Sequence, residues 1–192
     1  MMRSIGFVGL GAMGSVMAPL PLKAGYCVIG FDLATTLGKN SGVCSASQLE
    51  DLVSCDAVIL MLPDGTTVAN VATSLANAGF RGLVIDMSSS HPRGTIALAE
   101  RLGKKSIRLI DAPVSGGQKK AAIGTLMIMV GGEKEDLDEI RTLLGCFGSV
   151  AHVGPLGAGH AMKALNNYVS AAGLLASMQA VSYTHLTLPT KA

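Results

Sequence analysis

The glycine spacing near the N-terminus constrains the fold more than any other feature of this sequence. Residues 9–14 read Gly-Leu-Gly-Ala-Met-Gly and follow an apolar segment directly. In a strand–turn–helix unit, the first glycine allows a tight turn, the second lets a pyrophosphate approach the backbone, and the third lets helix and strand pack closely. N–H groups at the helix start then hold the phosphate. The motif therefore predicts a dinucleotide-binding loop formed by Gly9, Leu10, Gly11, Ala12, Met13 and Gly14.

An acidic residue at the expected end of the second strand indicates which dinucleotide is bound. Asp32 follows the motif at a distance near the expected one of about 20 residues. A carboxylate there accepts hydrogen bonds from both ribose hydroxyls and repels a 2′-phosphate, so Asp32 favours NAD over NADP. Two alternatives stay open from these residues alone: Asp32 as a solvated loop residue, and a methyltransferase that binds adenosylmethionine through the same opening.

The rest of the first 154 residues alternates short apolar runs with longer helix-like segments. This alternation is typical of βαβ units and a parallel sheet, and continuous apolar runs are typical of strands covered on both faces. We expect strands at 5–9, 28–31, 57–62, 83–87, 108–111, 126–131 and 150–153. We expect helices at 12–24, 47–53, 65–78, 92–102 and 133–144. The sequence thus predicts an α/β fold of the Rossmann type, doubly wound around a mainly parallel sheet.

The pattern changes after Gly154-Pro155. From Ala158 to about Val181 the only breaker is Gly173, which predicts one long helix rich in Ala and Leu. We therefore expect an NAD(P)-binding domain over residues 1–154 and the first long helix of a truncated all-α domain over 155–180. Residues 181–192 bring β-branched residues and a proline where the helix should go on. They resemble translated sequencing-adapter sequence, so we expect a non-native tail there.

Composition argues against several classes of function. The net charge of only +2 gives no strong attraction to nucleic acid or to an anionic membrane, and the absence of Trp argues against base stacking as a mode of binding. No apolar stretch reaches the roughly 18 residues that a membrane span needs. The four cysteines have no C-x-x-C spacing, so we expect reduced core thiols, no metal site and a cytoplasmic protein.

Four blocks of the chain together resemble the β-hydroxyacid dehydrogenase family, which includes dehydrogenases of 3-hydroxyisobutyrate and tartronate semialdehyde. Their order and spacing fit the family over about residues 3–180. The first block joins the glycine motif to Lys23-Ala-Gly25, and the second is Asp86-Met-Ser-Ser-Ser. The third runs from Asp111-Ala-Pro-Val-Ser-Gly-Gly117 to Gly132, and the fourth combines Gly154, Gly157 and Gly159 with Lys163-Ala-Leu-Asn-Asn167.

The last two blocks also have a physical interpretation of their own. Ser115, Gly116 and Gly117 end a strand region with small residues whose N–H groups can converge on a carboxylate, although an ordinary Gly-rich turn remains an alternative. Lys163 and Asn167 are spaced i and i+4 and share one helix face. Most helical lysines are solvated, but Lys163 has small apolar neighbours. Burial there would lower its pKa and suit it to acid–base chemistry.

The resemblance implies a role for each of these residues. Lys163 is implied as the catalytic general acid/base, Asn167 as the amide that positions substrate and lysine, and Ser115, Gly116 and Gly117 as the clamp for a substrate carboxylate. The remaining implied contacts are to the cofactor: Leu62, Pro63, Thr67 and Ser89. The implied reaction is NAD(P)-dependent hydride transfer that interconverts a short β-hydroxyacid and its semialdehyde or keto form. The full-length parent is implied to be a homo-oligomer, and we expect the truncated chain to be a poor catalyst.

Some features depart from the family or favour other functions. The first expected helix contains Pro19-Leu-Pro21 near a position where the family commonly has asparagine, and Pro21 predicts a kink. A decarboxylating relative of 6-phosphogluconate dehydrogenase would carry His where this chain has Asn166. A non-catalytic dinucleotide-binding fragment is the alternative from another class. His91, His152 and His160 have no useful spacing, and we expect them in loops or caps.

Overall fold

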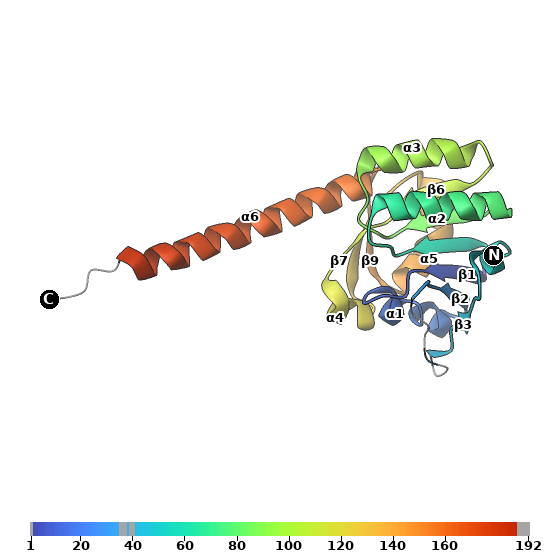
Figure 1. Ribbon diagram of the computed structural model, residues 1–192, viewed down its shortest axis with the longest axis horizontal. Helices are drawn as coiled ribbons and strands as arrows, with labels where there is room; N and C mark the ends of the chain where they lie inside the picture. The colour runs from blue at the N-terminus through green and yellow to red at the C-terminus, as the bar shows by residue number, and fades with distance from the viewer. Residues whose placement is uncertain (1, 35–37, 39–40, 188–192) are drawn as a thin grey trace.

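The computed structural model describes residues 2–34, 38 and 41–187. Within these residues the centre is a nine-stranded sheet in the order β3-β2-β1-β4-β5-β6-β8-β7, with β9 paired to β8 (Figure 1). Strands β1 to β6 run parallel, whereas β8 is antiparallel to β6 and β7 and parallel to β9. The strand bounds are β1 Ser4–Val8, β2 Cys27–Phe31, β3 Cys44–Ser45, β4 Ala57–Leu60, β5 Leu83–Asp86, β6 Arg108–Asp111, β7 Val114–Ser115, β8 Leu126–Gly131 and β9 Gly148–Gly154.

Helices cover both faces of this sheet (Figure 1). Helices α2 and α3 pack on one face, whereas α1, α4 and α5 pack on the other. The α-helices are α1 Gly14–Met17, α2 Gly65–Ala78, α3 Pro92–Gly103, α4 Gly117–Ala122, α5 Lys134–Gly145 and α6 Ala158–Thr187, with 3-10 helices η1 Leu20–Ala24 and η3 Leu49–Leu52. The predicted Rossmann-type α/β fold with a long helix after it is confirmed.

The apolar runs form two cores because successive strand residues point to opposite faces of the sheet. In β4, Ala57 and Ile59 belong to the core under α1 and α5, whereas Val58 and Leu60 belong to the core under α2 and α3. All four are fully buried. Burying each such Val, Leu or Ile side chain contributes about 1.5–3 kcal/mol, so a continuous apolar run is what a doubly covered strand requires.

The first helix is shorter than predicted. In place of one helix over 12–24, α1 ends at Met17 and the chain continues as the 3-10 helix η1. Pro19 and Pro21 cause the break, because proline has no N–H to donate and its ring displaces the preceding turn. The helix predicted over 47–53 is likewise only the short 3-10 helix η3. The prediction missed β3, β7 and α4, which have too few residues to show a periodic pattern.

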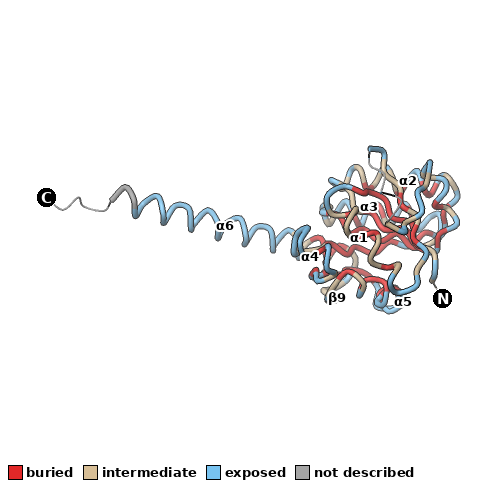
Figure 2. The backbone as a smooth tube through the Cα atoms, turned by 90° about the horizontal axis from the view of Figure 1, so that it is seen from below, coloured by how far each residue is buried: buried red, intermediate tan, exposed pale blue. Residues whose placement is uncertain are grey.

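Helix α6 is longer than predicted. It runs for 30 residues to Thr187, so the expectation that the helical pattern stops near Val181 was wrong. Val, Ser, Tyr and Thr inside a helix cost at most about 0.7 kcal/mol each, too little to end a long helix. Beyond its first turns α6 extends away from the sheet with exposed side chains (Figures 1 and 2). Among the described residues, no helix combines the length and apolarity that crossing a membrane requires.

Candidate active site

The glycine-rich loop lies between β1 and α1, where the strand order reverses between β1 and β4. Gly9 has a φ of +95°, and a Cβ on it would overlap the carbonyl oxygen of Met61. A Cβ on Gly14 would overlap the carbonyl oxygen of Gly9, so this glycine lets the helix pack against the strand. A Cβ on Gly11, in contrast, would meet no atom within 4 Å. Packing therefore explains Gly9 and Gly14, whereas the room beside Gly11 fits a ligand phosphate that approaches the backbone.

Asp32 lies at the end of β2, beside this loop. Its Oδ2 accepts a hydrogen bond from the backbone N–H of Leu10 at 2.6 Å, and its Oδ1 accepts one from Ala34 N–H at 2.8 Å. The carboxylate thus holds the loop and faces a pocket of about 650 Å³ between the ends of β1, β2 and β4 and helix α2. Of the predicted cofactor contacts, the residues that line this pocket are Gly9, Asp32, Leu62, Pro63 and Thr67.

The start of α2 holds Thr67 at the rim of the same pocket. The Asp64 carboxylate is the N-cap of α2 and accepts hydrogen bonds from Thr67 N–H at 2.8 Å and from Thr67 Oγ1 at 3.1 Å. The hydrogen bond from the Thr67 N–H is the main cause that lowers the pKa of Asp64. Thr67 is therefore fixed by a local helix cap, which orients its hydroxyl independently of any ligand.

A second cleft of about 240 Å³ adjoins the first. Leu62 and Pro63 line both, so the two form neighbouring parts of one groove along the carboxyl ends of the strands. Ligands of doubly wound sheets bind at this edge. The second cleft is lined by Met13, Met61, Leu62, Pro63, Met87, Ser88, Ser89, Val114, Gly116, Gly117 and Lys163. The structure therefore brings Lys163 together with Ser89, Gly116 and Gly117.

Lys163 enters the cleft from the first turns of α6. Its side chain is half-buried, and burial lowers the pKa of its ε-amine. A lower pKa makes the neutral amine more accessible near neutral pH, which is what a general base needs. Opposite it, Gly116 and Gly117 have φ values of +138° and +70°, a region that favours glycine.

Two other predicted site residues, Ser115 and Asn167, do not line the second cleft. Ser115 ends β7, and its Oγ accepts a long hydrogen bond of 3.5 Å from the amide Nδ2 of Asn166. Asn167 is exposed and lies outside the lining of the second cleft. The contact to the Ser115 loop comes from Asn166, whereas the resemblance implies that Asn167 positions substrate and lysine.

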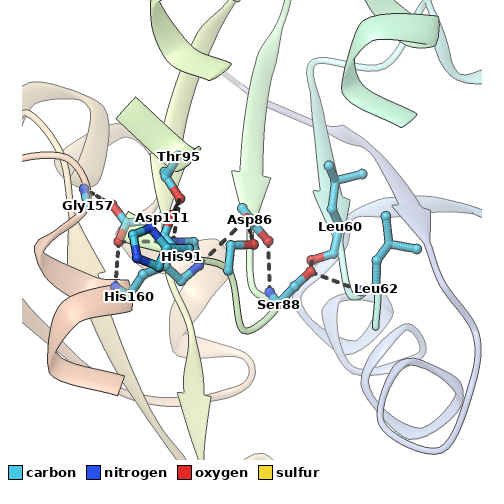
Figure 3. A network of polar contacts seen from close by, with 10 residues as sticks. Leu60, Leu62, Asp86, Ser88, His91, Thr95, Asp111, Gly157 and His160 are labelled. Atoms are coloured by element: carbon cyan, nitrogen blue, oxygen red, sulfur yellow. Dashed lines mark hydrogen bonds and ion pairs between the residues drawn. The ribbon is translucent and has the colours of Figure 1, made fainter. Parts of the chain in front are cut away.

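Prediction from the sequence missed a buried polar cluster at the start of α6 (Figure 3). The expectation that His160 lies in a loop or cap was wrong, because it is a buried residue of α6 whose ring faces Thr95, Asp86 and Asp111. His91 does occupy the N-cap position of α3, and His152 lies in β9 with its Nε2 2.9 Å from the carbonyl oxygen of Gly132.

Two glycines make room for this cluster. A Cβ on Gly159 would overlap the carbonyl oxygen of Met129 and come within 2.8 Å of Asp111 Oδ2. A Cβ on Gly131 would lie 2.5 Å from Asp111 Oδ1. These glycines let α6 approach the sheet closely, and His160, which follows Gly159, is buried there.

Comparison with known proteins agrees with this geometry. Residues 4–154 match the sequence family described as the NAD binding domain of 6-phosphogluconate dehydrogenase. The chain is 40% identical over 173 residues to 2-(hydroxymethyl)glutarate dehydrogenase of Eubacterium barkeri, covering 85% of this chain and 57% of that protein. It is 35% identical over 190 residues to the NAD-dependent L-serine dehydrogenase of Pseudomonas aeruginosa, covering 94% and 64%. The chain belongs to the β-hydroxyacid dehydrogenase family. The match to an NAD-binding domain agrees with the cofactor that the glycine loop and Asp32 predict.

A solved structure of this family has the same architecture. Mycobacterium tuberculosis 3-hydroxyisobutyrate dehydrogenase with L-serine superposes with a TM-score of 0.90 at 36% identity, over 99% of this chain and 68% of that one. The chain spans 57% and 64% of the length of the two curated relatives named above.

Proposed function

We propose that this chain is the cofactor-binding part of an NAD-dependent dehydrogenase of short β-hydroxyacids, with Lys163 as general acid/base. The single observation that carries the proposal is the shared cleft of Lys163, Ser89, Gly116 and Gly117, which adjoins the pocket that contains Asp32. In this proposal the Gly9–Gly14 loop, Asp32, Leu62, Pro63, Thr67 and Ser89 hold the dinucleotide. Residues 1–154 are its binding domain.

The chemistry divides between the cofactor and the protein. NAD, when bound, accepts a hydride from the carbon that carries the substrate hydroxyl. Neutral Lys163 takes the hydroxyl proton as that carbon is oxidised, and charged Lys163 returns the proton in the reverse direction. Partial burial lowers the pKa of Lys163, which favours the neutral amine that the oxidation step needs. The N–H groups of the Ser115, Gly116 and Gly117 loop hold the substrate carboxylate.

The substrate class follows from what the relatives' names have in common. 2-(Hydroxymethyl)glutarate, L-serine and 3-hydroxyisobutyrate each carry a hydroxyl on the carbon β to a carboxylate. One anion site and one base at a fixed separation select this arrangement, because they position the hydroxyl-bearing carbon as well as the charge. We therefore propose a short β-hydroxyacid as substrate and an α-hydroxyacid such as lactate as a poor one.

Asn166 argues against a decarboxylating enzyme of the 6-phosphogluconate type. That reaction class would use an imidazole at this position, but the Asn166 amide has no titrating proton and donates to Ser115 Oγ.

The other alternative is that the chain by itself binds the dinucleotide without catalysing a reaction. Helix α6 carries Lys163 but is exposed beyond its first turns, so little of the chain packs around the helix that holds the lysine (Figure 2). We infer that the chain alone binds NAD and turns over slowly.

The test combines binding and turnover on one preparation. NAD affinity is measured by calorimetry, and NADH formation is followed over hours with 3-hydroxyisobutyrate, L-serine and lactate. We expect NAD binding, slow oxidation of the two β-hydroxyacids and none of lactate. Lys163→Met should bind NAD normally and lose turnover by about 10²–10⁴-fold. Normal turnover by Lys163→Met, or equal turnover of lactate, would contradict the proposal.

A further inference from the structure

Asp111 joins the end of β6 to the start of α6 (Figure 3). Its Oδ1 accepts the N–H of Gly157 and its Oδ2 accepts the N–H of His160, both at 2.7 Å. The carboxylate thus caps the helix from another element, satisfying N–H groups that a helix start leaves without partners. Burial raises the pKa of Asp111, and these two hydrogen bonds oppose that shift. The cap fixes where α6 begins, but one capped end leaves the rotation of the helix about its axis to other contacts.

The ring of His160 supplies such a contact. Its side chain is fully buried, and Nδ1 shares a hydrogen bond of 2.8 Å with Thr95 Oγ1 of α3. The same Nδ1 lies 3.6 Å from Asp111 Oδ2, and Nε2 lies 3.6 Å from Asp86 Oδ2 of β5. Nε2 is the buried side-chain atom that lacks a hydrogen-bond partner among the described residues. A carboxylate oxygen just beyond hydrogen-bond distance is therefore its nearest acidic partner, within reach of a small shift of the ring.

Asp86 carries this contact on to the cleft. Its Oδ1 accepts the N–H of Ser88 at 2.9 Å, and its Oδ2 accepts the hydroxyl of Ser90 at 2.7 Å. The Ser88 hydroxyl in turn accepts the N–H of Leu62 at 2.9 Å and donates to the carbonyl of Leu60 at 3.2 Å. Ser88, Ser89 and Leu62 all line the cleft of Lys163. His160 therefore lies between two carboxylates with different tasks. Asp111 holds the start of α6, which carries Lys163, and Asp86 holds the Ser88–Ser90 segment, which lines the same cleft.

We propose that His160 is a positioning residue, which fixes Lys163 against the Ser88–Ser90 loop by linking α6 to Asp86 and Thr95. His160 and Lys163 are spaced i and i+3, so they share one side of α6, where the histidine is buried and the lysine lines the cleft. The inference rests on the proposed role of Lys163. The three groups that face the ring are Asp86 from β5, Asp111 from β6 and Thr95 from α3. Within the described residues, no set of His, Cys, Asp and Glu side chains is arranged to hold a metal.

The test measures the position of Lys163 without measuring activity. His160→Gln keeps a polar side chain but replaces the ring, and Thr95→Val removes its hydrogen-bond partner while the ring stays. His152→Gln is the matched control, because it makes the same change at a histidine of β9 whose ring contacts the carbonyl oxygen of Gly132. Each variant is labelled on lysine and backbone nitrogen, and NMR follows the titration midpoint of Lys163 and the amide signals of Ser88 and Ser90.

We expect His160→Gln to move the Lys163 midpoint upward, because a displaced ε-amine gains water, and to shift the Ser88 and Ser90 amides. Thr95→Val should give a smaller shift of the same sign, and His152→Gln none. A folded His160→Gln chain with an unchanged midpoint and unchanged amides overturns the proposal. So does the failure of both variants to fold, because His160 then acts on stability alone. An ordinary midpoint in the unaltered chain would refute the acid–base role of Lys163, yet the Ser88 and Ser90 amides would still report on His160.

Discussion

The carboxylate of Asp32 is bonded to the backbone N–H of Leu10, with 2.6 Å between Oδ2 and N. The residue that is expected to select the ribose therefore also holds the loop that is expected to bind the pyrophosphate. Oδ2 accepts the N–H of Leu10 and Oδ1 accepts the N–H of Ala34, so this one side chain ties the glycine-rich loop to the end of β2.

Replacing Asp32 should change cofactor preference. We expect the unaltered chain to bind NAD more tightly than NADP, because a 2′-phosphate would face the carboxylate. Asp32→Ala should weaken NAD binding by roughly 10–100-fold, since hydrogen bonds to a charged group contribute about 1.5–3 kcal/mol. Asp32→Asn removes the negative charge but keeps an oxygen that can accept the N–H of Leu10. It therefore separates the effect of the charge on cofactor preference from the effect of holding the loop. Calorimetry with both cofactors tests this, and tighter NADP binding by the unaltered chain would contradict it.

The glycines of the loop should respond differently to the same change. Gly11→Ala adds a methyl group where no atom lies within 4 Å, so stability should change by less than about 0.5 kcal/mol while NAD affinity falls at least tenfold. Gly14→Ala places its methyl group on the Gly9 carbonyl and should lower the free energy of unfolding itself. Urea unfolding and NAD titration of both variants separate the two effects. Equal losses of stability would show that Gly11 is also a packing glycine.

Lys163 should make stability depend on pH in a defined window. Burial lowers its pKa below the ordinary 10.5, so the unfolded chain holds the proton more tightly than the folded chain. The charged lysine therefore destabilises the fold below its folded pKa, and this effect disappears as pH rises through that pKa toward 10.5. Lys163→Met should unfold at a higher temperature than the unaltered chain near pH 7, and the difference should shrink by pH 10.

Thermal unfolding between pH 7 and 10 measures this difference. The exposed Lys119→Met serves as the control for losing one positive charge. A difference for Lys163→Met that stays constant across the range would mean that the lysine is solvated to the same extent in both states.

The exposed part of α6 should make the chain associate. Leu174, Met178 and Val181 are exposed and follow i, i+4 and i+7, so they share one face, while Leu165 and Val169 are exposed on another. Helices that are apolar on several sides are normally covered. We expect self-association that grows with concentration and is reduced by the double variant Leu174→Lys, Met178→Lys. Sedimentation velocity tests this, with Gln179→Lys as a control that adds charge without removing apolar surface. A monomer at all concentrations would contradict it.

Much of the fold could be predicted because its signals are local. The Arg108–Asp111 and Leu126–Gly131 strands and the Gly65–Ala78 helix have the predicted bounds, since apolar runs and caps mark them in the sequence. The 12–24 segment shows the limit of periodicity. Its apolar pattern suits a helix, but Pro19 and Pro21 override that pattern through the backbone.

The buried cluster around His160 could not be predicted in the same way. Its members come from β5, β6, α3 and α6, so their proximity depends on strand order and on how closely one helix approaches the sheet. The same limit explains why the sequence pointed to Asn167, whereas Asn166 contacts Ser115 in the structure. Helical spacing places Asn167 on the side of Lys163, but only the actual rotation of α6 brings Asn166 to Ser115.

The Asp111 cap has a consequence for the order in which the site assembles during folding. It joins residues 46 and 49 positions apart, whereas the bond from Leu10 to Asp32 spans 22. Closing a longer loop loses more chain entropy, and an isolated helix start nucleates poorly. The first turn of α6 therefore gains its cap only after β6 has joined the sheet. On this account the start of the helix that carries Lys163 is set by a partner that is distant in the sequence, and not by the residues next to the helix.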